Sequence, residues 1–206
     1  MNKTTTQLDI VREDRIRDIL VKLNLSPEHL SYIKEKNPST NLPYHGYQHL
    51  ISVSIACFNS GKYYFSSETD MIRPLFLAGL YHAWNHSGGD YEDSINVARA
   101  IVGMAEAVNE LESFEHKVVD EIATLISVTE HPAQRSPQNT SEKIILDADK
   151  LQWTEPDFER WSAGLVREVH QNVTLETIKK SLITQSIYTS WARKIFFDKG
   201  MVDLSW

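Results

Sequence analysis

Cysteine is almost absent from this sequence: Cys57 is the only one among 206 residues. A single cysteine excludes an internal disulfide framework and any zinc site made from several thiolates. It also suits a reducing compartment, so we expect a cytoplasmic protein. Glycine and proline are scarce too, with 8 and 7 copies, which argues against collagen-like, low-complexity and turn-rich all-β architectures.

Positive charge and long apolar runs are also lacking. The 21 lysines and arginines are outnumbered by 28 aspartates and glutamates, and no basic stripe stands out, so we expect no duplex nucleic acid as a partner. The longest apolar run, LFLAGLYHAW, is too short to cross a bilayer. The segment MNKTTTQLDIVRED lacks the apolar stretch of a signal peptide, and we therefore expect no membrane contact.

Helical periodicity dominates what is present, because apolar residues recur at spacings of three and four. We expect helices over 7–24, from 26–28 to a break at 37–43, and over 44–59, 67–86, 90–108, 116–130, 141–153, 155–170, 175–187 and 191–197. Ser60-Gly61 is expected to end the third of these, and 131–140 to form a loop. The pattern predicts a single all-α domain over 1–206, with roughly eight to ten helices and a frayed segment at 1–6.

Two pairs of histidines are spaced four residues apart: His45 with His49, and His82 with His86. On a helix this spacing places both side chains on one face, one turn apart. Imidazole is the commonest protein ligand for transition metals, so each pair is a candidate for aiming two ligands at one point. A surface or core role remains the alternative for any single histidine.

Two carboxylates, Asp147 and Asp149, lie inside the apolar segment IILDADKLQW. Charged acids are rarely buried unless they are paired or bind a metal. The alternative is that both flank the first turn of a helix, where the helix dipole favours negative charge.

Taken in order, several segments resemble the HD superfamily of metal-dependent phosphohydrolases. The motifs that carry the resemblance are LPYHGYQHL, LAGLYHAWNHSGG, YEDSINVARA, ISVTEHP, ILDADKL and WSAGLVREV. Each motif is loose by itself, but their order and spacing together are fairly specific. The resemblance implies an HD-domain helical bundle that uses one or two divalent ions (Mn, Mg, Zn, Co or Fe).

The resemblance also implies roles for individual residues. It assigns metal ligation to His49, His82 and Asp149, with His86, His131 and Asp147 as possible additional ligands. His45 matches the histidine that protonates the leaving oxygen in phosphodiesterases, and His86 matches a phosphate-side or second-metal histidine. Candidate substrate contacts are Lys150 and Arg167 for phosphate, and Tyr44 and Trp84, with Tyr47 and Trp153, for a stacked base. For these aromatic residues, packing in the core is the alternative.

The chain departs from the family pattern at one position. The family is named for an adjacent His and Asp, but here His82 is followed by Ala83, which has no donor atom. Loss of an anionic ligand weakens cation binding and raises the pKa of a bound water. Three explanations stay open: an engineered inactivation, compensation by His86, Asp90 or Glu92, or a degenerate binding protein.

These observations lead to one expected function and two alternatives. We expect metal-dependent hydrolysis of a nucleotide-like phosphoester, by a phosphodiesterase or nucleotide phosphohydrolase weakened or inactivated by Ala83, with reduced metal occupancy. The alternatives are a non-catalytic protein that binds or sequesters a nucleotide, and a di-iron oxygenase of the same fold. The expected partner is a small phosphoester, while the sequence leaves the substrate and the oligomeric state open.

Overall fold

The structure, a computed structural model, describes residues 6–66, 68–89, 93–130, 136–156, 158–169 and 186–199. Over these ranges it contains nine α-helices, one short 3-10 helix and no β-strand. The prediction of an all-α protein with roughly eight to ten helices is therefore confirmed. Among the described helices, none is long and apolar enough to cross a membrane.

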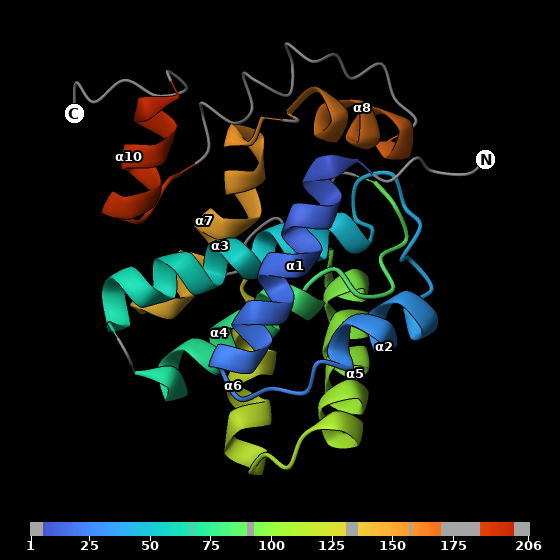
Figure 1. Cartoon of the computed structure of the whole chain (residues 1–206), viewed down its shortest axis with the longest axis vertical. Coiled ribbons are helices and arrows are strands. Elements are labelled where there is room, and N and C mark those ends of the chain that lie inside the picture. Colours follow the sequence, from blue (N-terminus) through green and yellow to red (C-terminus); the bar gives the residue numbers. More distant parts are fainter. Residues whose placement is uncertain are drawn as a thin grey trace.

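The helices follow one another along the chain as Figure 1 shows. Their bounds are α1 Gln7–Lys22, α2 His29–Lys36, α3 Tyr47–Phe65, α4 Thr69–Tyr81, α5 Ser94–Leu111, α6 His116–Ser127, α7 Thr140–Leu151, η1 Gln152–Thr154, α8 Phe158–Val169 and α10 Ser190–Asp198. The expected helix over 175–187 lies outside the described residues, apart from its last two positions. Residues 1–5 also lie outside them, whereas Thr6 is the N-cap of α1 and accepts a hydrogen bond from the Asp9 N–H.

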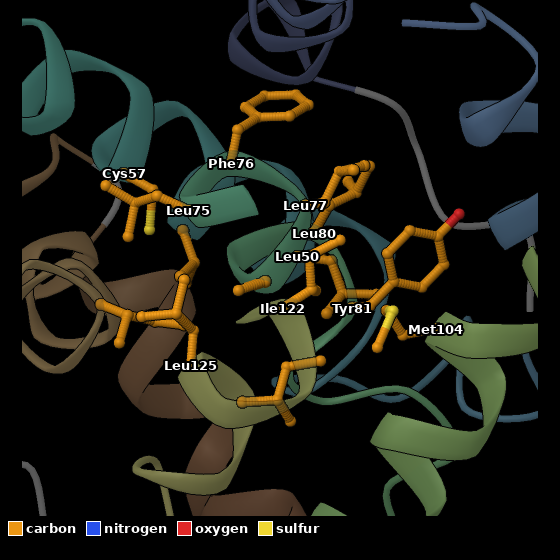
Figure 2. Close-up of a cluster of buried hydrophobic side chains, with 14 of the residues drawn as sticks. Leu50, Cys57, Leu75, Phe76, Leu77, Leu80, Tyr81, Met104, Ile122 and Leu125 are labelled. Carbon is orange, nitrogen blue, oxygen red and sulfur yellow. The ribbon is translucent and has the colours of Figure 1, made fainter. Parts of the chain in front are cut away.

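The core lies where α3 and α4 pack together, with α5, α6 and α7 around them. Figure 2 shows this cluster, in which Leu50 comes from α3, Leu77 and Leu80 from α4, and Ile122 from α6. All four side chains are fully buried. Burying a leucine or isoleucine stabilises a fold by about 1.5–3 kcal/mol, so this cluster anchors the two helices that carry the histidine motifs.

Two glycines let α3 and α4 approach closely. A Cβ atom on Gly61 would lie 3.3 Å from a methyl group of Leu75, and one on Gly79 would lie 2.9 Å from Sγ of Cys57. The expected helix end at Ser60-Gly61 is therefore wrong, since α3 continues to Phe65. The glycine marks a close packing contact instead of a terminus.

The helix ends beside the histidines also differ from expectation. α3 begins at Tyr47, after the extended Gly46, and α4 ends at Tyr81. His45 therefore precedes its helix and His86 follows its helix, so the prediction that each pair shares a helix face is wrong. A turn after α4 brings His86 back towards the core, with Asn85 at a φ of 55° and its N–H donating to Oδ1 of Asn37.

Candidate metal centre

Three of the predicted ligands converge at one point. Nε2 of His49 lies 2.9 Å from Nε2 of His82, and these two atoms lie 3.4 and 3.5 Å from Oδ1 of Asp149. They come from the first turn of α3, the carboxyl end of α4 and the last turn of α7. Both histidines are fully buried, while the Asp149 side chain is 33% exposed. The group therefore opens to solvent on the side of Asp149.

The hydrogen bonds behind the two rings decide which nitrogens carry lone pairs. Nδ1 of His49 lies 2.7 Å from Oε1 of Gln152, and Nδ1 of His82 lies 2.9 Å from the carbonyl oxygen of Gly79. Both partners are acceptors, so both Nδ1 atoms donate a proton. Each Nε2 then directs a lone pair towards the other ring and Asp149. A ring N–H bonded to an acceptor behind the metal-facing nitrogen is typical of histidines that bind a metal.

The spacing of the three atoms fits a single transition-metal ion. Ligands about 2.1 Å from an ion, at angles between octahedral and tetrahedral, lie about 3.0–3.4 Å from one another. The observed separations of 2.9, 3.4 and 3.5 Å fall inside this range or within about 0.1 Å of it. Two imidazoles and a carboxylate suit Zn, Fe, Co or Mn better than Mg, which prefers oxygen ligands.

The charge states of the group favour a cation. Burial, together with the adjacent His82, lowers the pKa of His49 to about 3. Burial also acts to raise the pKa of Asp149, but the neighbouring imidazoles of His82 and His49 hold it well below its ordinary value. At neutral pH the site therefore presents a carboxylate and a neutral His49.

A second buried cluster lies beside the first and contains His45, His86 and Glu168. One ligand atom from each lies within 4.8 Å of the others. Nδ1–H of His45 donates to Oε2 of Glu168 at 2.8 Å. The backbone N–H groups of Tyr44 and His45 donate to Oε1, with the latter bond at 3.0 Å. Glu168 on α8 thus holds the segment that precedes α3.

The rings of the second cluster are poorly oriented for sharing an ion. The imidazoles of His45 and His86 are stacked, with centroids 3.7 Å apart and planes 19° from parallel. Nitrogen lone pairs lie in the ring plane, so two stacked rings direct them along separate planes. Nδ1 of His86 also accepts the Gly88 N–H at 3.0 Å, and its Nε2 lies 3.2 Å from Nδ2 of Asn96. This cluster is therefore hydrogen-bonded within the protein.

Burial sets the charge states of this second cluster as well. It lowers the pKa of His45 to about 3, although the Asp149 carboxylate acts in the opposite direction. It raises the pKa of Glu168, against the hydrogen bonds from the Tyr44 and His45 N–H groups. His45 is therefore neutral at pH 7, with its proton on Nδ1, and no described residue forms a hydrogen bond with its Nε2.

Two predicted residues next to Asp149 face the carboxyl-terminal segment. Asp147 is buried and its carboxylate accepts the N–H groups of Tyr188 and Thr189, at 2.9 and 2.7 Å. The Nζ of Lys150 donates to the carbonyl oxygen of Ser186 at 2.8 Å. Asp147 therefore belongs to neither ligand cluster and instead anchors the start of α10.

Arg167 is exposed and belongs to neither cluster, whereas its neighbour Glu168 is buried in one of them. The Arg167 guanidinium is exposed and donates to the carbonyl oxygen of Ala163. It lines a surface pocket of about 510 Å³ with Tyr44 and Gln48, but the three converging ligands do not line this pocket. Of these two neighbours in the WSAGLVREV motif, the fold thus brings the glutamate to the histidines.

The aromatic candidates are core residues. Trp84 packs against Tyr32 and Tyr81, and a Cβ atom on Gly103 would lie 2.1 Å from its Nε1. Tyr44 is buried and stacks on Trp153, with ring centroids 5.4 Å apart. The Tyr44 ring also lies 4.9 Å from the His49 ring, so it supports a ligand from behind.

Ala83 follows His82 directly, is 1% exposed and supplies no ligand atom. His131, Asp90 and Glu92 lie outside the described residues. The sequence reasoning missed Glu168 and Gln152, which hold His45 and His49. Glu168 lies in the motif WSAGLVREV, so the resemblance could have indicated it. For Gln152, the one signal was its place directly after ILDADKL.

A comparison with known protein families finds none whose model matches the chain, and a comparison with curated proteins finds no matching sequence. Any assignment of function therefore depends on the motifs and on the geometry of these two clusters.

Proposed function

We propose that the chain is an HD-type phosphohydrolase that uses a divalent metal to hydrolyse a nucleotide-like phosphoester. The observation that carries the proposal is the convergence of His49, His82 and Asp149, with all three atoms within 3.5 Å of one another. These residues come from three separate motifs of the resemblance. A chance similarity of motifs gives no reason for their side chains to meet.

The residues around the site divide the chemistry between them. When bound, a divalent ion supplies polarisation of a phosphoryl oxygen and activation of a water molecule. Glu168 holds the Nδ1 proton of His45 and leaves Nε2 for proton exchange with the leaving oxygen. The negative charge of a phosphoester beside His45 stabilises its protonated form, which burial otherwise disfavours. Asp149 is the most exposed ligand, so the substrate approaches from its side.

Ala83 is the feature that argues for weak activity. It lies beside a ligand, is buried and has no donor atom, so three protein ligands remain among the described residues. Three protein ligands with open positions are typical of catalytic metal sites, so this number is compatible with turnover. A carboxylate at position 83 is expected to bind the ion more tightly and to raise the rate.

A phosphate-release assay on cyclic and linear nucleotides tests the proposal. The chain and its Ala83→Asp variant are assayed with Mn, Mg, Zn, Co and Fe, beside a His49→Ala variant of each. We expect metal-dependent turnover that is greater in the Ala83→Asp variant and absent without His49. No turnover by either form with any of these metals would overturn the proposal.

A binding protein without turnover is the second candidate, and the missing donor at Ala83 favours it. Calorimetry that detects tight nucleotide binding, together with no hydrolysis after Ala83→Asp, would support this candidate. The di-iron oxygenase has less support, because the stacked rings of His45 and His86 are poorly oriented for a second ion. Iron content with an oxygen-dependent product is its test.

A further inference from the structure

Gln152 lies behind the candidate metal centre and forms hydrogen bonds with His49, Tyr44 and Asp149. It is 1% exposed and is the first residue of η1, directly after α7. Its Oε1 accepts the Nδ1–H of His49 at 2.7 Å. Its Nε2 donates to the hydroxyl of Tyr44 and, at 3.2 Å, to the carbonyl oxygen of Asp149.

The orientation of the Gln152 amide follows from these partners. A backbone carbonyl only accepts hydrogen bonds, so the amide group facing Asp149 is the NH₂. The oxygen must then face His49, which fixes the Nδ1–H tautomer of that ring. A reversed amide would place a donor against Nδ1, move the His49 proton to Nε2 and block its use as a ligand.

We propose that Gln152 is a positioning residue that presets His49 and Asp149 for one cation. Its side-chain amide fixes the tautomer of His49 on α3 and holds the backbone of Asp149 on α7. The two candidate ligands are therefore positioned by one residue. The inference rests on the proposed metal centre, but it does not depend on which phosphoester is hydrolysed. Mutation of a residue that hydrogen-bonds to a metal ligand typically lowers metal affinity by about 10–100-fold.

Tyr44 contributes to this arrangement through Gln152. Its hydroxyl accepts from Nε2 of Gln152, so removal of the hydroxyl leaves the NH₂ group with the Asp149 carbonyl as its acceptor, while Oε1 keeps its bond from His49. We therefore expect a graded series, in which Tyr44→Phe weakens metal binding less than Gln152→Ala does. Gln152→Glu keeps an oxygen that accepts the Nδ1–H of His49, so it preserves the tautomer of that ring. It loses the hydrogen bonds that the NH₂ group donates to Tyr44 and to the Asp149 carbonyl.

The test is a titration of the full chain with Co²⁺, followed by the absorption of the bound ion. We expect Gln152→Ala to weaken Co²⁺ binding by about 10–100-fold. Gln138→Ala is the matched control, because Gln138 is exposed and, among the described residues, its side chain bonds only to the Ser136 carbonyl. The Co²⁺ affinity of this variant is expected to equal that of the unmodified chain. Equal Co²⁺ affinity in Gln152→Ala and the unmodified chain would overturn the inference.

A second measurement keeps the inference testable if Gln152→Ala folds poorly. Long-range ¹H–¹⁵N spectra of the metal-free protein report which nitrogen of His49 carries the proton. The unmodified chain and Gln152→Glu are expected to hold it on Nδ1, and Gln152→Ala is expected to show both tautomers. An Nε2–H tautomer in the unmodified chain would contradict the inference.

Failure of the unmodified chain to bind Co²⁺ would instead overturn the metal centre, and Co²⁺ binding without phosphoester turnover would overturn only the proposed reaction.

Discussion

The guanidinium of Arg160 lies 2.7 Å from Oδ1 of Asp9 and thereby joins α8 to the first turn of α1. Figure 1 shows the beginning of α1 close to α8 at one end of the molecule. Asp9 also completes the capping box of α1 with Thr6. Burial acts to raise the pKa of Asp9, but the hydrogen bonds from Arg160 and Thr6 outweigh it and lower the pKa below its ordinary value.

The first prediction concerns the pH dependence of this contact. Because folding lowers the pKa of Asp9, its contribution is complete above the unfolded-state value of about 3.9 and is lost as the pH falls through the folded-state value. We expect Asp9→Asn to lower the free energy of unfolding by about 1 kcal/mol at pH 7, and by less near pH 3. Urea unfolding at both pH values measures this, with Asp70→Asn, 93% exposed, as the control. An equal loss at both pH values would contradict it.

The second prediction concerns Gly103, where α5 contacts Trp84. A Cβ atom there would lie 2.1 Å from the indole nitrogen. Alanine favours a helix over glycine by about 1 kcal/mol, but this overlap costs more, so we expect Gly103→Ala to destabilise the protein by about 1–3 kcal/mol. Thermal unfolding checks this against Val102→Ala, which changes a neighbouring exposed position. A stabilised Gly103→Ala would show that Trp84 has room to move.

The third prediction concerns metal removal. A ligand that binds only the folded state stabilises it by about 2.7 kcal/mol when present at 100 times its dissociation constant. We expect Zn²⁺ to raise the unfolding midpoint of the unmodified chain and a chelator to reverse this change. His82→Ala is expected to abolish the effect, whereas His116→Ala, at an exposed position, retains it. A full Zn²⁺ response in His82→Ala would place the ion elsewhere.

The fourth prediction separates the two aspartates of α7. Asp147 accepts two backbone N–H groups at the start of α10, while Asp149 belongs to the converging ligands. Asp147→Asn is expected to cost about 1–3 kcal/mol and to speed proteolysis near α10, with metal affinity unchanged. Asp149→Asn is expected to weaken metal binding while the proteolysis pattern stays the same. Loss of the metal in Asp147→Asn would make it a ligand after all.

The helical class could be predicted from the sequence, because it depends on local pattern. Apolar periodicity marks helices regardless of their neighbours. The resemblance of three motifs to the HD superfamily singled out His49, His82 and Asp149 as a set, even though the predicted shared helix faces were wrong. The meeting of these side chains depends on how α3, α4 and α7 pack.

The residues that sequence reasoning missed are defined by tertiary contacts. A glutamate and an arginine next to each other on a helix are equivalent in pattern, and only packing shows that Glu168 is buried and Arg167 exposed. Gly61 looked like a helix end because glycine usually interrupts helices. Its contact with Leu75 is visible only once α4 is in place.

The close approach of α3 and α4 at Gly79 connects the hydrophobic core to the distance between His49 and His82. A Cβ atom there would lie 2.9 Å from Cys57 and 3.0 Å from the backbone of Ser54, and the Gly79 carbonyl also holds His82. A larger residue at this crossing would separate the helices that carry His49 and His82, and so lengthen the span between the two imidazoles. If the proposed site binds a cation, laboratory evolution towards a larger or smaller ion should therefore begin among these small buried residues of the helix crossing.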